Sequence, residues 1–311
     1  MSKTVSLKTW VAAARLRTLP LALATILLGT LLGVYNGFFN WQILIWSSLT
    51  AFFYQVLSNF ANDLGDGLKG TDANRVGEKR AVASGEISIK QMKLAVSTFV
   101  VLSLFSGSYV SWIATRELPL WVTITFIVLG LLATLAAINY TMGKRAYGYS
   151  GWGDLFVLVF FGWVGVIGSN FLQTNILDFK LLLPASAVGF LAMGVLNLNN
   201  MRDIENDKIA GKNTLVVYMG LDKAKVYHQL LLAGAILLQA IYVALTKPGF
   251  GGYLFLATAP LLFANAKKAT RASTAEEFEP LLKPLALTTL MFCIFAGVGQ
   301  NLKSILLLIN I

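Results

Sequence analysis

The sequence predicts an all-α membrane protein, because it is poor in charge and its apolar residues come in long blocks. Of the 311 residues, 56% are hydrophobic and only 13% are charged, whereas soluble domains average about 25% charged residues. The apolar blocks are about 17–25 residues long, the length at which an α-helix crosses a ~30 Å hydrocarbon core. A soluble fold could not bury so many blocks, so we expect a single transmembrane domain over residues 1–311.

The hydropathy pattern predicts nine transmembrane helices. The expected spans are Leu19–Tyr35, Trp41–Asn62, Leu94–Ile113, Leu118–Tyr140, Leu155–Thr174, Leu181–Met201, Val226–Thr246, Gly251–Ala266 and Leu285–Leu308. Residues 1–18 carry four basic side chains scattered among apolar ones. This pattern is typical of an amphipathic helix on the membrane surface and not of a signal peptide.

The basic residues predict the orientation of the chain. Of the 25 Lys and Arg, 21 lie in the N-terminal segment or in the loops after the second, fourth, sixth and eighth spans, and 4 lie on the other side. The positive-inside rule then places the N-terminus and these loops in the cytoplasm and the C-terminus outside, in a multi-pass protein of the inner (plasma) membrane. This asymmetry also explains the net charge of +10, so we expect no nucleic-acid partner.

Two similar acidic clusters follow the second and the sixth span, both on the predicted cytoplasmic side. One runs from Gln55 to Asp72 and the other from Asn197 to Thr214, and each passes through asparagines to spaced aspartates, then to a Lys and a Gly. We interpret them as a weak internal duplication that brings two helix ends together. A simpler alternative is that both are solvated loop ends, where charge commonly collects, but two Asn-rich clusters on one side argue against it.

The spacing and the residue types of these clusters indicate a magnesium–diphosphate site. Asp63 and Asp66 are three residues apart and Asp203 and Asp207 are four apart, so each pair would share a helix face. Paired carboxylates repel each other unless a cation neutralises them. Carboxylate and amide oxygens favour Mg²⁺, and a chain with one His and one Cys excludes a His/Cys metal site. The neighbouring Lys and Arg suit an anion held through the metal ions.

A glycine-rich stretch from Tyr140 to Asp154 predicts an irregular loop with functional side chains. Tyr140 could face the reacting centre and Lys144 could contact phosphate; the alternative is an interfacial belt of aromatic and basic anchors. Arg80 is either a phosphate ligand or simply a positive charge on the inner side. Side chains that could line a prenyl tunnel, or otherwise serve in packing, are Phe52, Phe53, Tyr54, Phe160, Phe161 and Trp163.

At these residues the chain resembles the UbiA superfamily of intramembrane prenyltransferases, over nearly its whole length. Within that superfamily it is most similar to the MenA branch, the 1,4-dihydroxy-2-naphthoate polyprenyltransferases. The resemblance is carried by Gln55–Asp72, Tyr140–Asp154, Phe160-Phe161-Gly162-Trp163, Asn197–Thr214 and the early Arg17-Thr18-Leu19-Pro20. It implies a nine-helix UbiA-like bundle around a central cavity that is capped on the cytoplasmic side.

The resemblance also implies which residues act. The expected Mg²⁺ ligands are Asn59, Asp63, Asp66, Asp203 and Asp207. The residues expected to bind substrate are Gln55, Asn62, Lys69, Asp72, Arg80, Lys144, Asn199, Asn200, Arg202 and Lys212. The four aspartates among the metal ligands, together with Tyr140, are the expected catalytic residues.

The implied reaction is a magnesium-dependent aromatic prenyl transfer. It moves a polyprenyl group from polyprenyl diphosphate to 1,4-dihydroxy-2-naphthoate, with loss of CO₂ and diphosphate, and gives demethylmenaquinol for menaquinone synthesis. Two alternatives stay open: another acceptor, such as 4-hydroxybenzoate or homogentisate, in the same fold, and a cation transporter, since intramembrane acids and repeats also occur there. A transporter would place its acids near mid-span, whereas Asp63 and Asp203 lie at span ends.

Overall fold

A computed structural model of the chain describes residues 5–70, 80–143 and 146–308. Within these ranges the regular structure is helical, without any β-strand. The elements in chain order are α1 (Leu7–Ala13), η1 (Leu16–Thr18), α2 (Leu19–Tyr35), α3 (Trp41–Lys69), α4 (Ile89–Thr115), α5 (Leu120–Asn139), η2 (Tyr147–Tyr149), α6 (Gly153–Val157), η3 (Leu158–Ile167), α7 (Gly168–Thr174), η4 (Phe179–Leu181), α8 (Leu182–Arg202), α9 (Ile204–Ile209), α10 (Leu215–Met219), α11 (Leu221–Thr246), η5 (Phe250–Thr258), α12 (Ala259–Arg271) and α13 (Ala275–Leu308).

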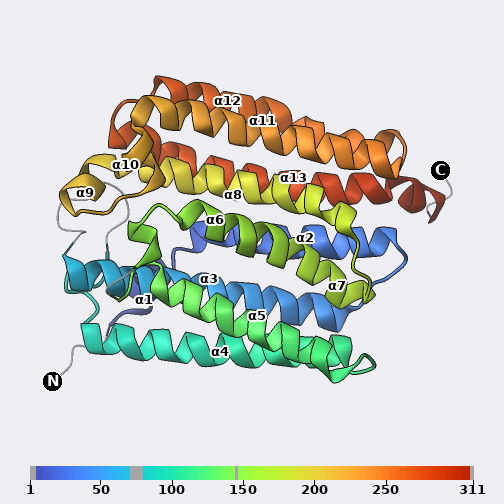
Figure 1. Cartoon of the computed structure of the whole chain (residues 1–311), viewed down its shortest axis with the longest axis horizontal. Coiled ribbons are helices and arrows are strands. Elements are labelled where there is room, and N and C mark those ends of the chain that lie inside the picture. The colour runs from blue at the N-terminus through green and yellow to red at the C-terminus, as the bar shows by residue number, and fades with distance from the viewer. Residues whose placement is uncertain (1–4, 71–79, 144–145, 309–311) are drawn as a thin grey trace.

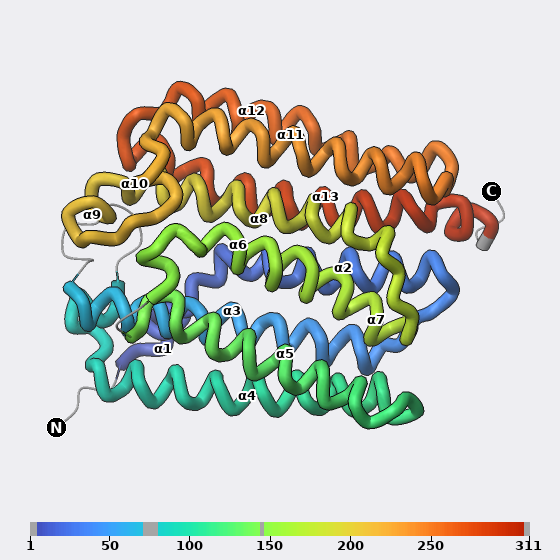
Figure 2. The backbone as a smooth tube through the Cα atoms, viewed as in Figure 1, coloured from blue at the N-terminus to red at the C-terminus, as the bar shows by residue number. Residues whose placement is uncertain are grey.

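The long helices lie side by side along the longest axis of the molecule, and the short helices α1, α9 and α10 lie toward one end (Figure 1). That end carries α1, α9 and α10, together with the C-terminal ends of α3, α5 and α8 (Figures 1 and 2). The last helix, α13, finishes at the opposite end of the bundle. The two acidic clusters and the glycine-rich stretch between α5 and α6 therefore converge at one end of the bundle.

Eight helical segments of the described ranges are long and apolar enough to cross a membrane. They are Leu7–Tyr35, Trp41–Lys69, Ile89–Thr115, Leu120–Asn139, Gly153–Thr174, Phe179–Arg202, Leu221–Thr246 and Ala275–Leu307. The other expected span, Gly251–Ala266, is helical too, as η5 and α12, and lies beside α11 (Figure 1). The all-helical membrane fold is confirmed, and the count of nine spans stays a prediction.

Helix α3 continues for two turns beyond its expected end at Asn62, so the first aspartate motif lies on a helix and not in a loop. Its 29 residues correspond to roughly 44 Å of helix, which exceeds the hydrocarbon core of about 30 Å. The side chain of Asn40 caps the start of the helix, and Gly70, with φ of 71°, ends it in the left-handed conformation that favours glycine.

The second aspartate motif has a different local structure. Helix α8 ends at Arg202, Asp203 forms the junction with φ of −94° and ψ of 6°, and α9 begins at Ile204. The amide of Asp207 still donates to the Asp203 carbonyl at 2.8 Å, so one turn joins the two aspartates. The expected duplication is therefore not matched in geometry, because one motif is a continuous helix and the other is a helix break.

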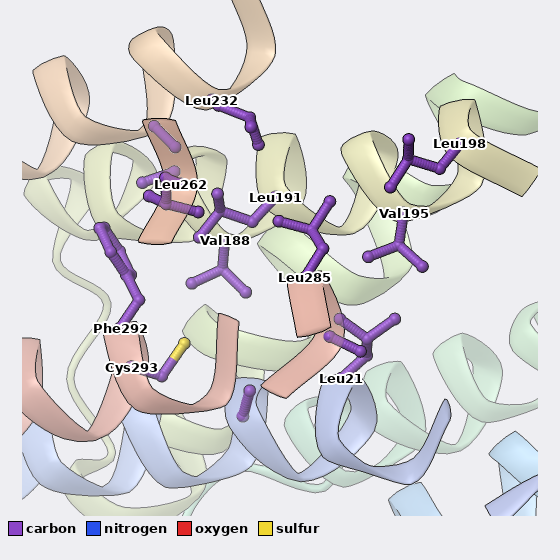
Figure 3. Close-up of a cluster of buried hydrophobic side chains, with 14 of the residues drawn as sticks. Leu21, Val188, Leu191, Val195, Leu198, Leu232, Leu262, Leu285, Phe292 and Cys293 are labelled. Carbon is purple, nitrogen blue, oxygen red and sulfur yellow. The ribbon is translucent and has the colours of Figure 1, made fainter. Parts of the chain in front are cut away.

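The main hydrophobic core lies where α8 packs against α2, α11 and α13, and α12 adds side chains to it from its contacts with α11 and α13 (Figure 3). Its buried side chains include Leu21, Val188, Leu191, Val195, Leu198, Leu232, Leu262, Leu285, Phe292 and Cys293. Because lipid tails are as apolar as these side chains, close packing rather than burial from water holds such a core together. The core fixes α8, which carries the second motif at its end.

The fifth expected span contains a π-helix, η3, between α6 and α7. A Cβ added at Gly162 would lie 2.7 Å from the Ala185 carbonyl oxygen and 3.2 Å from the Gly189 Cα, so this contact with α8 admits no side chain. π-Helical turns are rare and commonly occur at functional sites. Here η3 contributes Phe160, Phe161 and Val164 to the wall of an internal cavity.

Candidate active site

The bundle contains a half-open cavity of about 430 Å³ that is polar at the end where the motifs converge and mainly apolar along the helices. The polar end is lined by Arg15, Arg17, Gln55, Asn59, Asn62, Asp66, Arg80, Tyr140, Asn199, Lys212 and Lys283. The apolar part is lined mainly by Leu21, Ile26, Phe126, Leu129, Phe160, Phe161, Val164 and Leu172. Of the tunnel candidates, Tyr54 lines it as well, whereas Phe52, Phe53 and Trp163 do not. Its chemistry suits a ligand with an anionic head and a hydrocarbon tail.

The cavity separates the expected site residues into two groups. Those that line it are Gln55, Asn59, Asn62, Asp66, Arg80, Tyr140, Asn199 and Lys212. Those described by the structure that do not line it are Asp63, Lys69, Asn200, Arg202, Asp203 and Asp207. The two remaining candidates, Asp72 and Lys144, lie outside the described residues.

Asp66 is the carboxylate that faces the cavity from α3. It is 3% exposed, its Oδ1 accepts a hydrogen bond from the Tyr149 phenol at 2.9 Å, and its Oδ2 lies 3.6 Å from Nη2 of Arg80. A nearly buried carboxylate is costly unless it is paired and hydrogen-bonded. These contacts give each of its oxygens a partner next to the cavity.

Asp63 lies one helical turn before Asp66, and its side chain points to the turn that follows Arg80 instead of the cavity. Its Oδ2 accepts a hydrogen bond from the backbone amide of Ala81 at 3.0 Å, and its Oδ1 accepts one from Val82 at 3.1 Å. The side chain is 1% exposed. The two carboxylates of the first motif therefore do not converge on a shared position in this structure, because one faces the turn that follows Arg80 and the other faces the cavity.

Polar side chains of α3 attach it to the N-terminal segment. Asn59 donates through Nδ2 to the Ala14 carbonyl at 2.8 Å and to Oγ1 of Thr18 at 3.1 Å. Gln55 donates to the same hydroxyl at 2.9 Å. These donations orient both amides, and Oε1 of Gln55 has no hydrogen-bond partner within the described ranges although it is buried. That oxygen is available to a bound ligand.

Arg202 organises the second motif. Its Nε and Nη2 donate to Oδ1 and Oδ2 of Asp203, both at 2.7 Å, and Nη2 also donates to Oδ1 of Asn199 at 2.8 Å. Its Nη1 donates to Glu279 of α13 at 2.5 Å, and Glu279 also pairs with Arg17. Arg202 thus forms a bidentate salt bridge with Asp203, the geometry in which Arg–carboxylate pairs are strong.

The other residues of the second motif lie close to this network. Nζ of Lys212 is 3.5 Å from Oδ1 of Asp207, and the Lys212 backbone amide donates to the Asp207 carbonyl at 2.8 Å. Asn200 is 3% exposed, and its Oδ1 has no hydrogen-bond partner among the described residues. The cation that reaches the cavity from this motif is therefore Lys212 and not Arg202.

Tyr140 is the C-cap residue of α5 and lines the cavity beside a second tyrosine. Its ring meets that of Tyr147 edge to face with centroids 5.3 Å apart. Burial raises the pKa of Tyr147 above its usual range, so the phenol stays protonated and donates to the Ala136 carbonyl at 2.8 Å. Gly148 permits this packing, because a Cβ there would lie 2.5 Å from the Tyr140 carbonyl oxygen.

Several residues of the site were not expected from the sequence. Arg15, Arg17 and Lys283 line the cavity, Glu279 joins two arginines, and Tyr149 contacts Asp66. Glu279 lies in a charged stretch before the expected span that begins at Leu285, so no local signal distinguishes it from Glu276 and Glu277. No local signal distinguishes Tyr149 from the other tyrosines of its glycine-rich stretch.

Comparison with known proteins agrees with this architecture. A family model described as the UbiA prenyltransferase family matches residues 22–287. A Haemophilus influenzae protein named 1,4-dihydroxy-2-naphthoate octaprenyltransferase is 43% identical over 296 residues, which cover 94% of this chain and 96% of that protein. The expected resemblance, including that to the dihydroxynaphthoate branch, is therefore confirmed.

Two solved structures share the fold at low sequence identity. A UbiA homolog from Aeropyrum pernix K1, solved in its apo form, has a TM-score of 0.69 at 16% identity and covers 93% of this chain and 99% of its own. A UbiA homolog from Archaeoglobus fulgidus, bound to GPP and Mg²⁺, has a TM-score of 0.55 at 19% identity with the same coverage. From its sequence and its helical bundle alike, this chain belongs to the UbiA prenyltransferase family.

Proposed function

We propose that this protein transfers a polyprenyl group from polyprenyl diphosphate to 1,4-dihydroxy-2-naphthoate, with release of diphosphate and CO₂. The observation that carries the proposal is the cavity, whose polar end holds Asp66 between Arg80 and Tyr149 and whose remainder is mainly apolar. A diphosphate fits the first region and a prenyl chain fits the second. The choice of acceptor is supported by the 43% identity to a relative named for dihydroxynaphthoate.

The residues of the polar end fit Mg²⁺. Asp66, Asn59 and Asn62 line the cavity and offer only oxygen ligands, which is the donor set that Mg²⁺ prefers together with substrate phosphates. The Archaeoglobus fulgidus neighbour was solved with GPP and Mg²⁺. We assign Asp66 and these asparagines as ligands, with Asp203 and Asp207 on the facing motif and Asp63 as the weakest member of the set. Bound Mg²⁺ would neutralise charge on the departing diphosphate.

Basic side chains of the chain complement that charge. Arg80 lies 3.6 Å from Asp66 on one side, and Lys212 reaches the cavity from the second motif. Donors that are already positioned where negative charge develops lower the barrier, because they do not reorganise during the reaction. Their role is to bind the diphosphate and to stabilise it as it leaves with the electron pair of the broken allylic C–O bond.

The acceptor ring then attacks the allylic carbon, and its carboxylate is lost. A C–C bond forms between the allylic carbon and the ring carbon that bears the carboxylate. The bond from that ring carbon to the carboxylate then breaks, CO₂ leaves, and the electron pair of the broken bond returns to the ring. Tyr140, at the polar end, is assigned the positioning of the ring. The apolar wall, including Phe160 and Phe161, excludes water that would otherwise capture the allylic cation, and the ring faces can stabilise positive charge.

The protein is a multi-pass membrane protein by its helices. We assign it to the bacterial inner membrane with the N-terminus and the polar end of the cavity in the cytoplasm and the C-terminus outside. Support comes from the 21 of 25 basic residues on that side and from α13 ending at the opposite end of the bundle (Figure 1). A water-soluble, anionic acceptor would then enter from the cytoplasm.

The test uses the purified protein in lipid nanodiscs with octaprenyl diphosphate and Mg²⁺. Each of three acceptors, 1,4-dihydroxy-2-naphthoate, 4-hydroxybenzoate and homogentisate, is supplied separately, and products are identified by mass spectrometry. We expect a decarboxylated prenylated naphthalene diol, formed only with the first acceptor and abolished by EDTA. Product from another acceptor alone would reassign the substrate, and cation flux in liposomes without any prenylated product would favour a transporter.

A further inference from the structure

Tyr149 lies where the two aspartate motifs meet. It belongs to η2, in the glycine-rich stretch between α5 and α6. Its phenol donates to Asp66 of the first motif at 2.9 Å, and its backbone carbonyl accepts a hydrogen bond from the amide of Asn213 of the second motif at 3.1 Å. Two different groups of one residue thus connect segments that are distant in sequence.

The phenol fixes the orientation of the Asp66 carboxylate. With Tyr149 on Oδ1 and Arg80 near Oδ2, each oxygen of this nearly buried group has its own partner. Hydrogen bonds to a ligating carboxylate set its direction, and their loss typically weakens metal binding by 10–100-fold. Removal of the hydroxyl alone should therefore lower the affinity for the metal ion and leave the positions of the neighbouring lysines unchanged.

The ring of Tyr149 gathers two lysines, one from each motif. Nζ of Lys69 lies 3.8 Å from the ring centroid and Nζ of Lys212 lies 5.5 Å from it. Both distances are within the range of cation–π attraction, which offsets part of the repulsion between the two ammonium groups. Two cations gathered by one ring beside the polar end of the cavity form a site for a polyvalent anion.

A purely interfacial role would look different. Interfacial tyrosines direct the hydroxyl to the headgroups and water, as expected for Tyr218, which lies nearby on α10 and is 70% exposed. The Tyr149 hydroxyl is instead used by a buried carboxylate, and its ring is covered by ammonium groups. Tyr218 therefore serves as a matched control.

We propose that Tyr149 is a positioning residue for the metal–diphosphate group: its phenol orients Asp66, and its ring holds Lys69 and Lys212 as a pair. The inference rests on the proposed function, since it concerns the same site. It also refines the role of Lys69, which was expected to bind substrate. Lys69 does not line the cavity, so it acts on the diphosphate from beside the cavity, through its position over the Tyr149 ring. Two substitutions separate the two parts of the proposal.

Tyr149→Phe removes the hydroxyl and keeps the ring. We expect the Mg²⁺ concentration for half-maximal rate to rise about tenfold, the size of one lost hydrogen bond to a charged group, while KM for the prenyl diphosphate at saturating Mg²⁺ changes little. Tyr149→Leu removes both, so KM for the prenyl diphosphate should also rise about tenfold. Tyr218→Phe should behave like the unmodified protein.

A binding measurement without turnover checks the same assignment. Calorimetric titration of each full-length variant in nanodiscs with inorganic diphosphate, at low and at saturating Mg²⁺, reports the anion affinity directly. Tyr149→Phe should bind diphosphate more weakly only at low Mg²⁺, and Tyr149→Leu at both concentrations. Thermal unfolding of each variant identifies a general loss of structure.

The outcomes distinguish the inference from the function on which it rests. Normal Mg²⁺ dependence and normal diphosphate binding in Tyr149→Phe would overturn the role of the phenol, whatever the acceptor is. Equal diphosphate affinity in Tyr149→Phe and Tyr149→Leu at saturating Mg²⁺ would overturn the role of the ring. Absence of prenyl transfer in the unmodified protein, with diphosphate binding intact, would reject the proposed function and leave the assignment of Tyr149 standing.

Discussion

Oδ2 of Asp63 accepts a hydrogen bond from the backbone amide of Ala81 at 3.0 Å, and its other oxygen accepts one from Val82. This carboxylate therefore fixes the turn that follows Arg80, whose side chain reaches the cavity. Asp66, three residues later, faces the cavity itself. The two aspartates are only three residues apart on the same helix but have different roles. Substitution of each residue can separate these roles.

We expect Asp66→Asn to lower the rate of prenyl transfer by about 100-fold, because a charged oxygen ligand and the partner of Arg80 are lost together. Asp63→Asn should act chiefly on stability, by about 1 to 3 kcal/mol, because the new NH₂ group cannot accept from a backbone amide. Steady-state kinetics and thermal unfolding of both variants provide the measurement.

The Mg²⁺ dependence of the Asp63 variant decides its role. If Asp63 fixes the turn, Asp63→Asn keeps the Mg²⁺ requirement of the unmodified protein, whereas Asp66→Asn raises it. A raised requirement in both variants would make Asp63 a metal ligand, as the family resemblance implies. Alanine variants of Asp203 and Asp207 extend the comparison to the second motif. Near-normal turnover in all four aspartate variants would contradict the proposed metal site.

The Arg202 network predicts a large difference between two substitutions. The Arg202 side chain is 1% exposed and pairs with Asp203, while Glu279 is 25% exposed. Arg202→Met removes the guanidinium that holds both oxygens of the buried Asp203, and we expect a loss of about 3 to 5 kcal/mol in unfolding free energy. Glu279→Gln keeps a hydrogen-bond acceptor and should cost less. Chemical unfolding in detergent checks the order, and the reverse order would contradict it.

Gln239 offers a stabilising substitution. It is fully buried in α11, and neither polar atom of its side chain has a hydrogen-bond partner among the described residues. An unsatisfied buried amide costs about 1 to 3 kcal/mol, so Gln239→Leu should raise the unfolding free energy by about 1 kcal/mol. Gln229→Leu on the same helix, which loses an exposed hydrogen bond to Thr270, should give no gain. A less stable Gln239→Leu protein would indicate a polar partner.

The contact of the π-helix with α8 can be tested with a pair of glycines. Gly162→Ala places a Cβ 2.7 Å from the Ala185 carbonyl oxygen, and we expect a loss of about 1 to 3 kcal/mol. Gly168→Ala, at the start of the following helix, meets only a Phe126 ring carbon at 3.7 Å and should be tolerated. The melting temperatures of the two variants are compared. Equal values would show that the backbone of η3 shifts at residue 162 to make room for the added methyl group.

The sequence by itself determined the membrane class, the helical fold and the two aspartate motifs as candidates. Hydropathy over about 20 residues is a local property, and the cost of a buried charge makes carboxylates at helix ends conspicuous. The boundaries were less well predicted. Helix α3 ran on to Lys69, because capping by Gly70 and contacts at its end, and not hydropathy, decide where it stops.

Only the tertiary structure decided which of these residues share the cavity. The contact between Asp66 and Tyr149 spans 83 positions in the chain, and that between Arg202 and Glu279 spans 77. Such contacts depend on how α3, α8 and α13 pack, through small residues and close side-chain fit, and no local pattern encodes them. The sequence therefore identified two carboxylate pairs, and packing assigned Asp66 to the cavity and Asp63 to the turn.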